Sequence, residues 1–410
     1  MKIFLILFLI SLSISFGQIP KILLGIDVLQ RDNFSLLNGK RIGLITNQTG
    51  VNRKLESTLS LFKKADNFDL VAVFSPEHGL KGNFVAGEKY SDYYDSTDGI
   101  TYYSLYGKTQ KPTPDMLKNI DALVYDIQDI GCRSYTYIST MGLAMEAAAE
   151  NNVEFIILDR PNPLGGLRVE GNIVEDGFFS FVSRYKIPYV YGLTCGELAR
   201  LINEEGFLSN GIKCKLNVVK MNDWNRNMLF DDTGLIWVPT STHVPYSDVS
   251  FYLVSTGVLG ELVTVSIGIS YTLPFQTFAA EWINPDTLAE KMNELNLHGV
   301  LFRPISYKTN YGPWSDKILN GVQIYITDKS KAELLPLQFY FMQVNNELYP
   351  DKKILEMADS TRIKMFDKVM GTDKIRIKFA EKYRVEDIKD FLDKNIESFK
   401  ELSKKYYLYE

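Results

Sequence analysis

The sequence predicts a doubly wound, mostly parallel α/β sheet followed by a smaller α+β domain. Four apolar stretches, at residues 40–50, 69–79, 122–135 and 153–166, each end abruptly in polar side chains. Near-continuous apolar runs are typical of strands that are covered on both faces. Helical patterns lie between these runs, and this alternation indicates parallel strands joined by right-handed crossovers.

The polar ends of the four predicted strands indicate a functional site. In open α/β sheets, ligands bind at the carboxyl ends of the strands, and parallel strands place those ends along one edge. We therefore expect a single cleft at this edge. Its predicted lining consists of Asn47, Glu77, His78, Asp126, Gln128, Asp129, Arg133, Asp159, Arg160 and Asn162.

The segments between the strands carry helix signals. Helical spacing is found at residues 53–64, 136–150 and 193–202. Thr194 and Glu197 form a capping box at the start of the last of these helices. Residues 79–101 have no periodicity and directly follow Glu77. A long loop beside a candidate active residue is a candidate lid over the substrate.

The character of the chain changes near Thr240. Residues 236–275 contain several prolines and glycines between aromatic and β-branched residues. We therefore place the first domain at residues 18–240 and the second at residues 241–410. The predicted elements of the second domain are a helix over 285–295, a strand over 321–327 and a helix-rich end over 330–410.

Residues 1–17 predict export. Lys2 supplies a positive start, an apolar stretch follows, and small residues precede a plausible cleavage point before Gln18. A buried N-terminal helix or a membrane anchor is the alternative, but the stretch is short for a span. We expect a periplasmic or secreted protein with no membrane span in the mature chain, because no later stretch is long and apolar enough.

Composition narrows the function classes. The net charge of −5 and the lack of a basic block argue against a nucleic-acid partner. Three cysteines exclude a fully paired disulfide framework, although one bridge between Cys195 and Cys214 is possible. No cysteine or histidine spacing indicates a metal site. Gly165 and Gly166 lack the spacing of a phosphate loop, so no nucleotide cofactor is expected.

Four motifs, at residues 42–50, 74–79, 126–137 and 158–166, resemble the exo-β-N-acetylmuramidase family, also called the NamZ family. The resemblance covers most of residues 23–240 and is looser afterwards. It implies a Rossmann-like N-terminal domain and a smaller C-terminal domain with a cleft between them. It also implies an exported glycoside hydrolase that releases N-acetylmuramic acid from the non-reducing end of peptidoglycan fragments. In the family's Ser-Pro-Glu-His-Gly motif the glutamate is catalytic, and it corresponds here to Glu77.

The chain departs from the family pattern near the domain junction. Many members carry Glu-Gly-Arg-Gly-Thr before Pro-Phe-Glu. Residues 265–272 here read Val-Ser-Ile-Gly-Ile-Ser-Tyr-Thr, and Gln276 follows Pro274 and Phe275. An acidic and a basic group are therefore missing, which bears on the range of substrates.

Glycoside hydrolysis usually requires two carboxyl groups, one of which protonates the leaving oxygen. Glu77 is the predicted general acid, and Asp126 is favoured over Asp129 as the second carboxyl group. A structural role, in a helix cap or an ion pair, is the alternative for one of these aspartates. His78 is expected to orient Glu77 or to bind a sugar hydroxyl.

The remaining candidates are substrate-binding residues. Arg133 and Arg160 suit the lactyl carboxylate of muramic acid, because a guanidinium binds carboxylate through two hydrogen bonds. A salt bridge between Arg160 and Asp159 is the structural alternative. The other candidates for contact with the sugar are Asn47, Gln128, Tyr135, Asn162 and Glu170.

Two other functions remain possible. The missing charged groups at 265–276 favour a non-catalytic periplasmic binder of muropeptides or sugars. An ester or amide hydrolase is the third hypothesis, in which Cys132 is the candidate nucleophile, but no Gly-x-Ser-x-Gly motif or clear histidine partner accompanies it.

Overall fold

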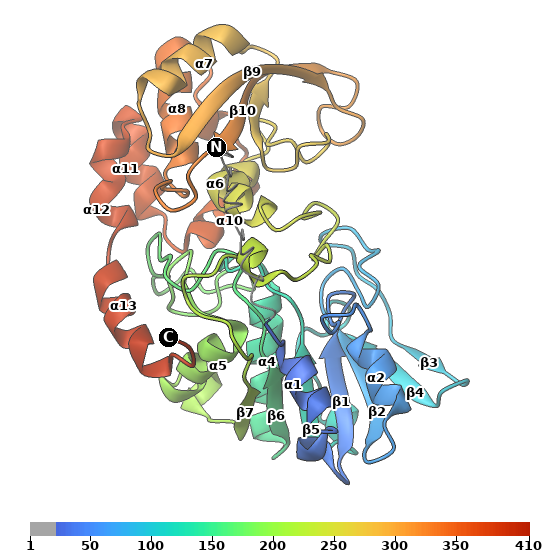
Figure 1. The fold of residues 1–410 in the computed structure, drawn as a ribbon. Coiled ribbons are helices and arrows are strands. Elements are labelled where there is room, and N and C mark those ends of the chain that lie inside the picture. Colours follow the sequence, from blue (N-terminus) through green and yellow to red (C-terminus); the bar gives the residue numbers. More distant parts are fainter. Residues whose placement is uncertain (1–21) are drawn as a thin grey trace, which may run out of the picture.

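A computed structural model describes residues 22–410, so the predicted signal segment at 1–17 lies outside the described residues. The first domain is built on a seven-stranded sheet in the order β3-β4-β2-β1-β5-β6-β7, seen at the bottom of Figure 1. All neighbouring pairs are parallel except the edge pair of β3 and β4. The strands are β1 (Arg41–Thr46), β2 (Asp69–Ser75), β3 (Tyr93–Asp95), β4 (Ile100–Ser104), β5 (Ala122–Asp126), β6 (Glu154–Leu158) and β7 (Leu216–Val219). The predicted doubly wound sheet is confirmed.

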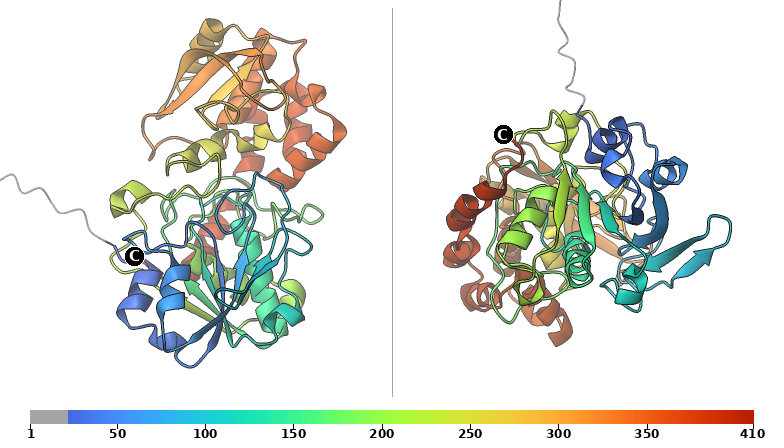
Figure 2. Two further views of the ribbon diagram at one scale, coloured as in Figure 1. Left: turned by 90° about the vertical axis from the view of Figure 1, so that its right-hand side faces the viewer. Right: turned by 90° about the horizontal axis from the view of Figure 1, so that it is seen from below.

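Helices cover both faces of this sheet (Figure 2). They are α1 (Gly25–Arg31), α2 (Thr58–Lys64), α3 (Pro114–Leu117), α4 (Tyr137–Glu150) and α5 (Cys195–Glu204). Strand side chains alternate between the two layers. Ile42 and Leu44 pack with α1 and α2, whereas Ile45 packs with α4 and α5. Because β2, β1, β5 and β6 are neighbouring parallel strands, their carboxyl ends lie along one edge of the sheet, as the apolar runs predicted.

Two local predictions about the first domain differ from the structure. The helix expected over 53–64 begins only at Thr58, because the Asn52 side chain accepts hydrogen bonds from the N–H groups of Lys54 and Glu56 and holds a turn. The loop expected over 79–101 contains β3, which pairs with β4 and stacks Tyr93 on Tyr102. This strand has three residues, too few to produce a periodic pattern.

The second domain contains an antiparallel three-stranded sheet in the order β8-β10-β9. Its strands are β8 (Thr277–Ala280), β9 (Val300–Lys308) and β10 (Ile318–Ile326), and its first helices are α6 (Val249–Gly260), α7 (Pro285–Glu294) and α8 (Leu337–Leu348). The predicted helix over 285–295 and strand over 321–327 correspond to α7 and β10. Sequence did not reveal α6, because it is buried on nearly all sides and therefore lacks a polar face.

The helix-rich end is also confirmed, and its last residues return to the first domain (Figure 1). After α8 it continues with α9 (Ile354–Met357), α10 (Ser360–Met370), α11 (Lys374–Lys382), α12 (Lys389–Leu392) and α13 (Ile396–Ser403). After α13, the Tyr409 hydroxyl donates to Asp159 over 2.6 Å, and the Leu408 N–H donates to Glu197 over 2.9 Å. The C-terminal segment is thus hydrogen-bonded to the end of β6 and to α5 in the first domain.

The cysteines do not form the bridge that was considered. Cys132, Cys195 and Cys214 are all free, buried thiols. In residues 22–410, no cluster of three or more His, Cys, Asp or Glu side chains is arranged to hold a metal ion. Within the same range, no helix is both long and apolar enough to cross a membrane.

Candidate active site

Glu77 lies just after β2, and its carboxylate is held from two other segments. Its Oε1 accepts a hydrogen bond from the Gly87 N–H at 2.9 Å, and its Oε2 accepts one from the Thr136 hydroxyl at 2.6 Å. Glu77 is only 8% exposed. Burial and the nearby Glu77 carboxylate raise the pKa of Tyr106 to about 12. The predicted lid therefore contacts Glu77 directly, through Gly87.

His78 adopts a backbone conformation that residues other than glycine rarely take. Its φ is 71°, in the left-handed region, and Gly79 follows with φ of 74°. The His78 Nδ1 lies 2.9 Å from the Phe84 carbonyl oxygen. Strained backbone of this kind persists only where surrounding contacts hold it. The turn fixes both the histidine and the glutamate before it.

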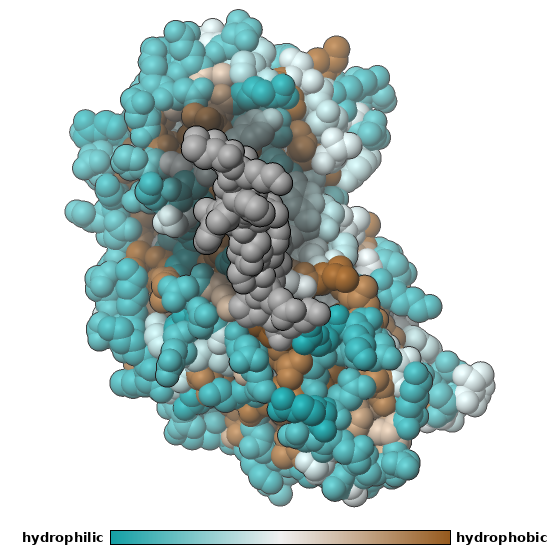
Figure 3. Space-filling view, in the orientation of Figure 1, coloured by the Kyte–Doolittle hydropathy of each residue, from teal (hydrophilic) through white to brown (hydrophobic). Residues whose placement is uncertain are grey.

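A cavity of about 360 Å³ opens beside Glu77. The first domain contributes Glu77, His78 and Tyr135 to its wall, and the second domain contributes His243, Glu261 and several apolar side chains. On the right-hand side of Figure 3, the surface narrows where the two domains meet. The volume lies within the range of about 300–1,000 Å³ that is usual for small-molecule sites.

Glu261 is a cavity residue that sequence reasoning missed. It directly follows α6 and lines the cavity opposite the first domain. Burial raises the pKa of its carboxyl group, and Arg362 opposes this shift only partly. An acidic residue at the end of the apolar run 249–260 was an available signal, of the same kind that identified the ends of the four strands.

Asp126, the favoured second carboxylate, lies away from this cavity in a buried ion pair. Its Oδ1 accepts from the Arg160 Nε at 2.6 Å, and its Oδ2 accepts from the Thr58 hydroxyl. Arg160 also donates to the Val51 carbonyl oxygen at 2.8 Å. We call Asp126, Arg160, Thr58 and Val51 the switch-point cluster. Asp126 ends β5 and Val51 follows β1, and the strand order reverses between these two strands.

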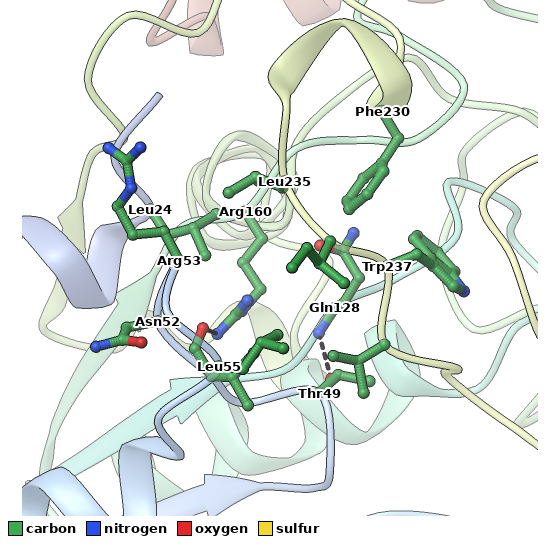
Figure 4. Close-up of a pocket in the computed structure, with 13 residues that line it drawn as sticks. Leu24, Thr49, Asn52, Arg53, Leu55, Gln128, Arg160, Phe230, Leu235 and Trp237 are labelled. Atoms are coloured by element: carbon green, nitrogen blue, oxygen red, sulfur yellow. Dashed lines mark hydrogen bonds between the residues drawn. The ribbon is translucent and has the colours of Figure 1, made fainter. Parts of the chain in front are cut away.

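The pocket at the switch-point cluster is very small (Figure 4). Its volume is about 20 Å³, which is room for about one water molecule. Arg160 and Gln128 lie among its lining residues, together with Thr49, whose hydroxyl accepts from the Gln128 N–H. No sugar fits in this space.

Arg133 does not lie in the cavity either, so we revise its predicted contact with the lactyl carboxylate. The guanidinium is completely buried and donates to the carbonyl oxygens of Asn172, Ile187, Val369 and Met370 at 2.7–3.1 Å. Burial lowers its pKa to about 10. Its role is to join the first domain to α10 and its neighbours.

Asp129 and Asp159 also make internal contacts. Asp129 Oδ2 accepts from the Tyr191 hydroxyl and from the Gly131 N–H. Asp159 caps the start of α5 by accepting from the Gly196 N–H at 2.8 Å. Burial raises the pKa of each aspartate to about 6.

The remaining predicted binding residues divide in the same way. Hydrogen bonds to nearby loop atoms are made by the side chains of Asn47, Gln128 and Asn162. Glu170 pairs with Arg168 and accepts from the N–H groups of Leu334 and Leu335, away from the cavity. Tyr135 lines the cavity and donates to Thr240 at 2.8 Å. Of the residues predicted from sequence, the structure therefore brings Glu77, His78 and Tyr135 together at the cavity.

Comparison with known proteins agrees with this two-domain arrangement. Residues 42–248 match the family described as exo-beta-N-acetylmuramidase NamZ, N-terminal, and residues 252–409 match the C-terminal family of the same name. The chain belongs to the NamZ family. The resemblance read from the four motifs is thus confirmed, and the family is one of glycoside hydrolases.

Individual NamZ relatives are similar over nearly the whole chain. The peptidoglycan beta-N-acetylmuramidase NamZ of Bacillus subtilis is 42% identical over 95% of this chain and 92% of its own length. A DUF1343 family protein of Bacteroides fragilis (BF0371) has a solved structure with 54% identity and a TM-score of 0.91, covering 95% of this chain and 99% of that one. A second such protein (BF0379) has 26% identity and a TM-score of 0.75 over the same shares.

Proposed function

We propose that this protein is an exo-β-N-acetylmuramidase that releases N-acetylmuramic acid from the non-reducing end of peptidoglycan fragments. The observation that carries the proposal is the placement of two carboxyl groups, Glu77 and Glu261, at one cavity between the domains. The activity named for the B. subtilis relative supports it. Two carboxyl groups facing one sugar site are the usual requirement for hydrolysis of a glycosidic bond.

In this proposal Glu77 is the general acid and Glu261 replaces Asp126 as the second carboxyl group. The hydrogen bonds from Gly87 and Thr136 hold the Glu77 carboxyl in place, which favours proton transfer to one defined oxygen. Glu261 then acts as base or nucleophile. The raised pKa of Glu261 supports the opposite assignment, with Glu261 as the acid and Glu77 as the base or nucleophile. Substitution of each glutamate distinguishes the two assignments.

The experiment compares wild-type protein with Glu77→Gln and Glu261→Gln on two substrates. One is p-nitrophenyl β-N-acetylmuraminide, whose leaving group needs little protonation, and the other is a muramic acid–glucosamine disaccharide. We expect both variants to lose about 100- to 10,000-fold in rate on the disaccharide. The variant that lacks the acid retains far more activity on the p-nitrophenyl substrate.

Glu88→Gln is the matched control, because Glu88 lies on the same loop and accepts from the Val85 N–H outside the cavity. It should keep wild-type rates. If Glu261→Gln also keeps them, Glu261 is not the second carboxyl group. If wild-type protein binds muramic acid without turnover, the result supports a non-catalytic sugar-binding protein. The apolar residues Ile267 and Ile269 at the cavity favour that alternative.

We also propose that residues 1–17 direct export to the periplasm or the medium. The positive start and the apolar run support this proposal. Cell fractionation and N-terminal sequencing of the mature protein test it. A mature chain that begins at Gln18 is the expected result, and an intact Met1 in the cytoplasm contradicts it.

A further inference from the structure

A second pocket lies in the first domain, and none of the residues at the cavity beside Glu77 lines it. Its volume is about 350 Å³, which suits a small molecule. Three phenylalanines, Phe179, Phe181 and Phe207, line it, and we call it the phenylalanine pocket. Phe179 is 44% exposed, so its ring is open to a ligand. Residues with hydrogen-bonding side chains complete the wall: Gln110, Glu146, Ser180, Arg184 and Ser209.

A single turn of the chain separates the phenylalanine pocket from the cavity. The main chains of Ser180 and Ser183 are hydrogen-bonded to each other and close this turn. Between them, Phe181 lines the phenylalanine pocket and Val182 lines the cavity. The Phe181 carbonyl oxygen accepts from the Ser139 hydroxyl at 2.7 Å, which holds the turn on the first residues of α4. The two spaces therefore lie on either side of one short segment.

An aromatic contact leads from Glu77 to the same turn. Burial raises the pKa of Tyr106, and the neighbouring Glu77 carboxylate adds to this shift, so the two side chains are close. The ring centroids of Tyr106 and Phe181 are 5.9 Å apart. A general acid protonates the leaving oxygen, so the sugars that depart begin beside the acid. With Glu77 as the acid, the rings of Tyr106 and Phe181 lie on the leaving-group side of the bond.

Helix α4 sets the distance between the two sites. Thr136, which precedes the helix, donates to Glu77, and Glu146 near its other end lines the phenylalanine pocket. These two positions are about 15 Å apart along the axis, because an α-helix rises about 1.5 Å per residue. One sugar in the cavity does not span this distance, whereas a glycan of several sugars does.

The chemistry of the phenylalanine pocket matches a pyranose ring. One face of such a ring carries C–H groups that pack on an aromatic side chain, and its edge carries hydroxyl groups that need hydrogen-bond partners. Phe179 and Phe207 supply aromatic surface. Gln110 and Arg184 supply hydrogen-bonding groups, and Arg184 also pairs with Glu146 at 3.2 Å, which neutralises the carboxylate at this wall.

We propose that the phenylalanine pocket binds a sugar of the glycan chain on the reducing-end side of the cleaved bond. This inference rests on the proposed function, with Glu77 as the acid. The chain leaves the cavity beside Glu77, passes the turn at Phe181 and stacks a later sugar on Phe179. The pocket therefore adds affinity for long peptidoglycan fragments, and a fragment too short to reach it gains nothing.

The test measures the binding of two fragments to Glu77→Gln, so that they are not cleaved during the titration. Isothermal titration calorimetry compares a muramic acid–glucosamine disaccharide with the hexasaccharide of three such units. We expect the hexasaccharide to bind about tenfold more tightly, and the further substitution Phe179→Ala to remove this gain. Equal affinity of the two fragments, binding of neither, or an equal loss for both in the alanine variant overturns the inference.

Three other variants, made in the same Glu77→Gln protein, test the contact itself. Phe179→Trp keeps an aromatic face and should keep the gain, whereas Phe179→Leu keeps an apolar side chain without a ring and should lose most of it. Phe178→Ala is the matched control, because Phe178 is the preceding residue and does not line the pocket. All variants must keep the melting temperature of the parent protein. A folded leucine variant with the full gain, or a folded Phe178→Ala without it, contradicts the assignment.

Turnover by protein with Glu77 intact is a separate readout. We expect Phe179→Ala to lower the ratio of kcat/KM for the hexasaccharide to that for the disaccharide by about tenfold. If wild-type protein cleaves neither fragment, the proposed enzymatic function fails, while a gain in binding that depends on Phe179 still supports the pocket. If it cleaves both and Phe179→Ala leaves the ratio unchanged, the function stands and the inference fails.

Discussion

Two polar sites occur along the same edge of the seven-stranded sheet, and they differ in what their charges do. In the switch-point cluster, Asp126 is satisfied by Arg160 and Thr58, and the space left is about 20 Å³. At the cavity, Glu77 accepts from neutral donors only, and the space beside it is about 360 Å³. In the switch-point cluster the charged groups satisfy one another and leave no room for a ligand, whereas the cavity beside Glu77 has room for one.

The difference shows how the second domain creates the site. The loops of the first domain fill the crevice where ligands of doubly wound sheets usually bind. The second domain adds Glu261 and His243 beside the end of β2, so a site forms there instead. The position of ligand binding on this fold thus depends on which loops or which residues of the second domain pack against each strand end.

The largest expected effect on stability comes from breaking the switch-point cluster. Asp126→Ala leaves Arg160 buried without its partner, so we expect the free energy of unfolding to fall by about 3–5 kcal/mol. Urea denaturation followed by circular dichroism measures this loss. The double replacement Asp126→Leu with Arg160→Met should recover most of it, because no unpaired charge remains.

Glu261→Gln provides the contrast, with stability expected to stay within about 0.5 kcal/mol of wild type. A mild effect of Asp126→Ala, or a severe one of Glu261→Gln, breaks the distinction between a structural and a functional carboxyl group.

A smaller effect is expected from pH, through Asp129. Burial raises the pKa of this carboxyl group to about 6, and its Oδ1 has no hydrogen-bond partner among the described residues. The folded state therefore binds a proton that the unfolded state, with a pKa of about 3.9, has already released. Between about pH 4 and pH 6, this group makes the free energy of unfolding fall as pH rises.

Asp129→Asn removes that dependence. The stability of the variant relative to wild type should increase by about 2 kcal/mol between pH 4 and pH 7. Chemical denaturation at a series of pH values measures the difference. A constant difference across this range shows that Asp129 titrates normally in the folded protein.

The smallest expected effect sharpens the role of Glu77. Thr136→Val removes the hydrogen bond to Glu77 Oε2, so we expect kcat/KM to fall about tenfold. Stability should change little, because the Thr136 side chain makes no capping hydrogen bond to α4. Thr136→Ser keeps the hydroxyl and should restore the rate. A rate loss in the serine variant equal to that in the valine variant rules out this contribution.

The sequence alone determined the four central parallel strands with the helices between them, the position of Glu77 at a strand end and the capping of α5 by Thr194. Each of these features depends on residues a few positions apart, so local periodicity and capping chemistry are sufficient to predict it. The motifs also determined the family, because four of them occur in order within one chain.

Only the tertiary structure decided which polar strand ends face a ligand and which are satisfied internally. Asp126 and Arg160 are 34 residues apart, and the carbonyl oxygens that Arg133 binds include two from α10, more than 230 residues away. Glu261 reaches the cavity from the other domain. Whether a charged side chain is free or paired depends on distances between elements that are remote in sequence, and no local pattern contains those distances.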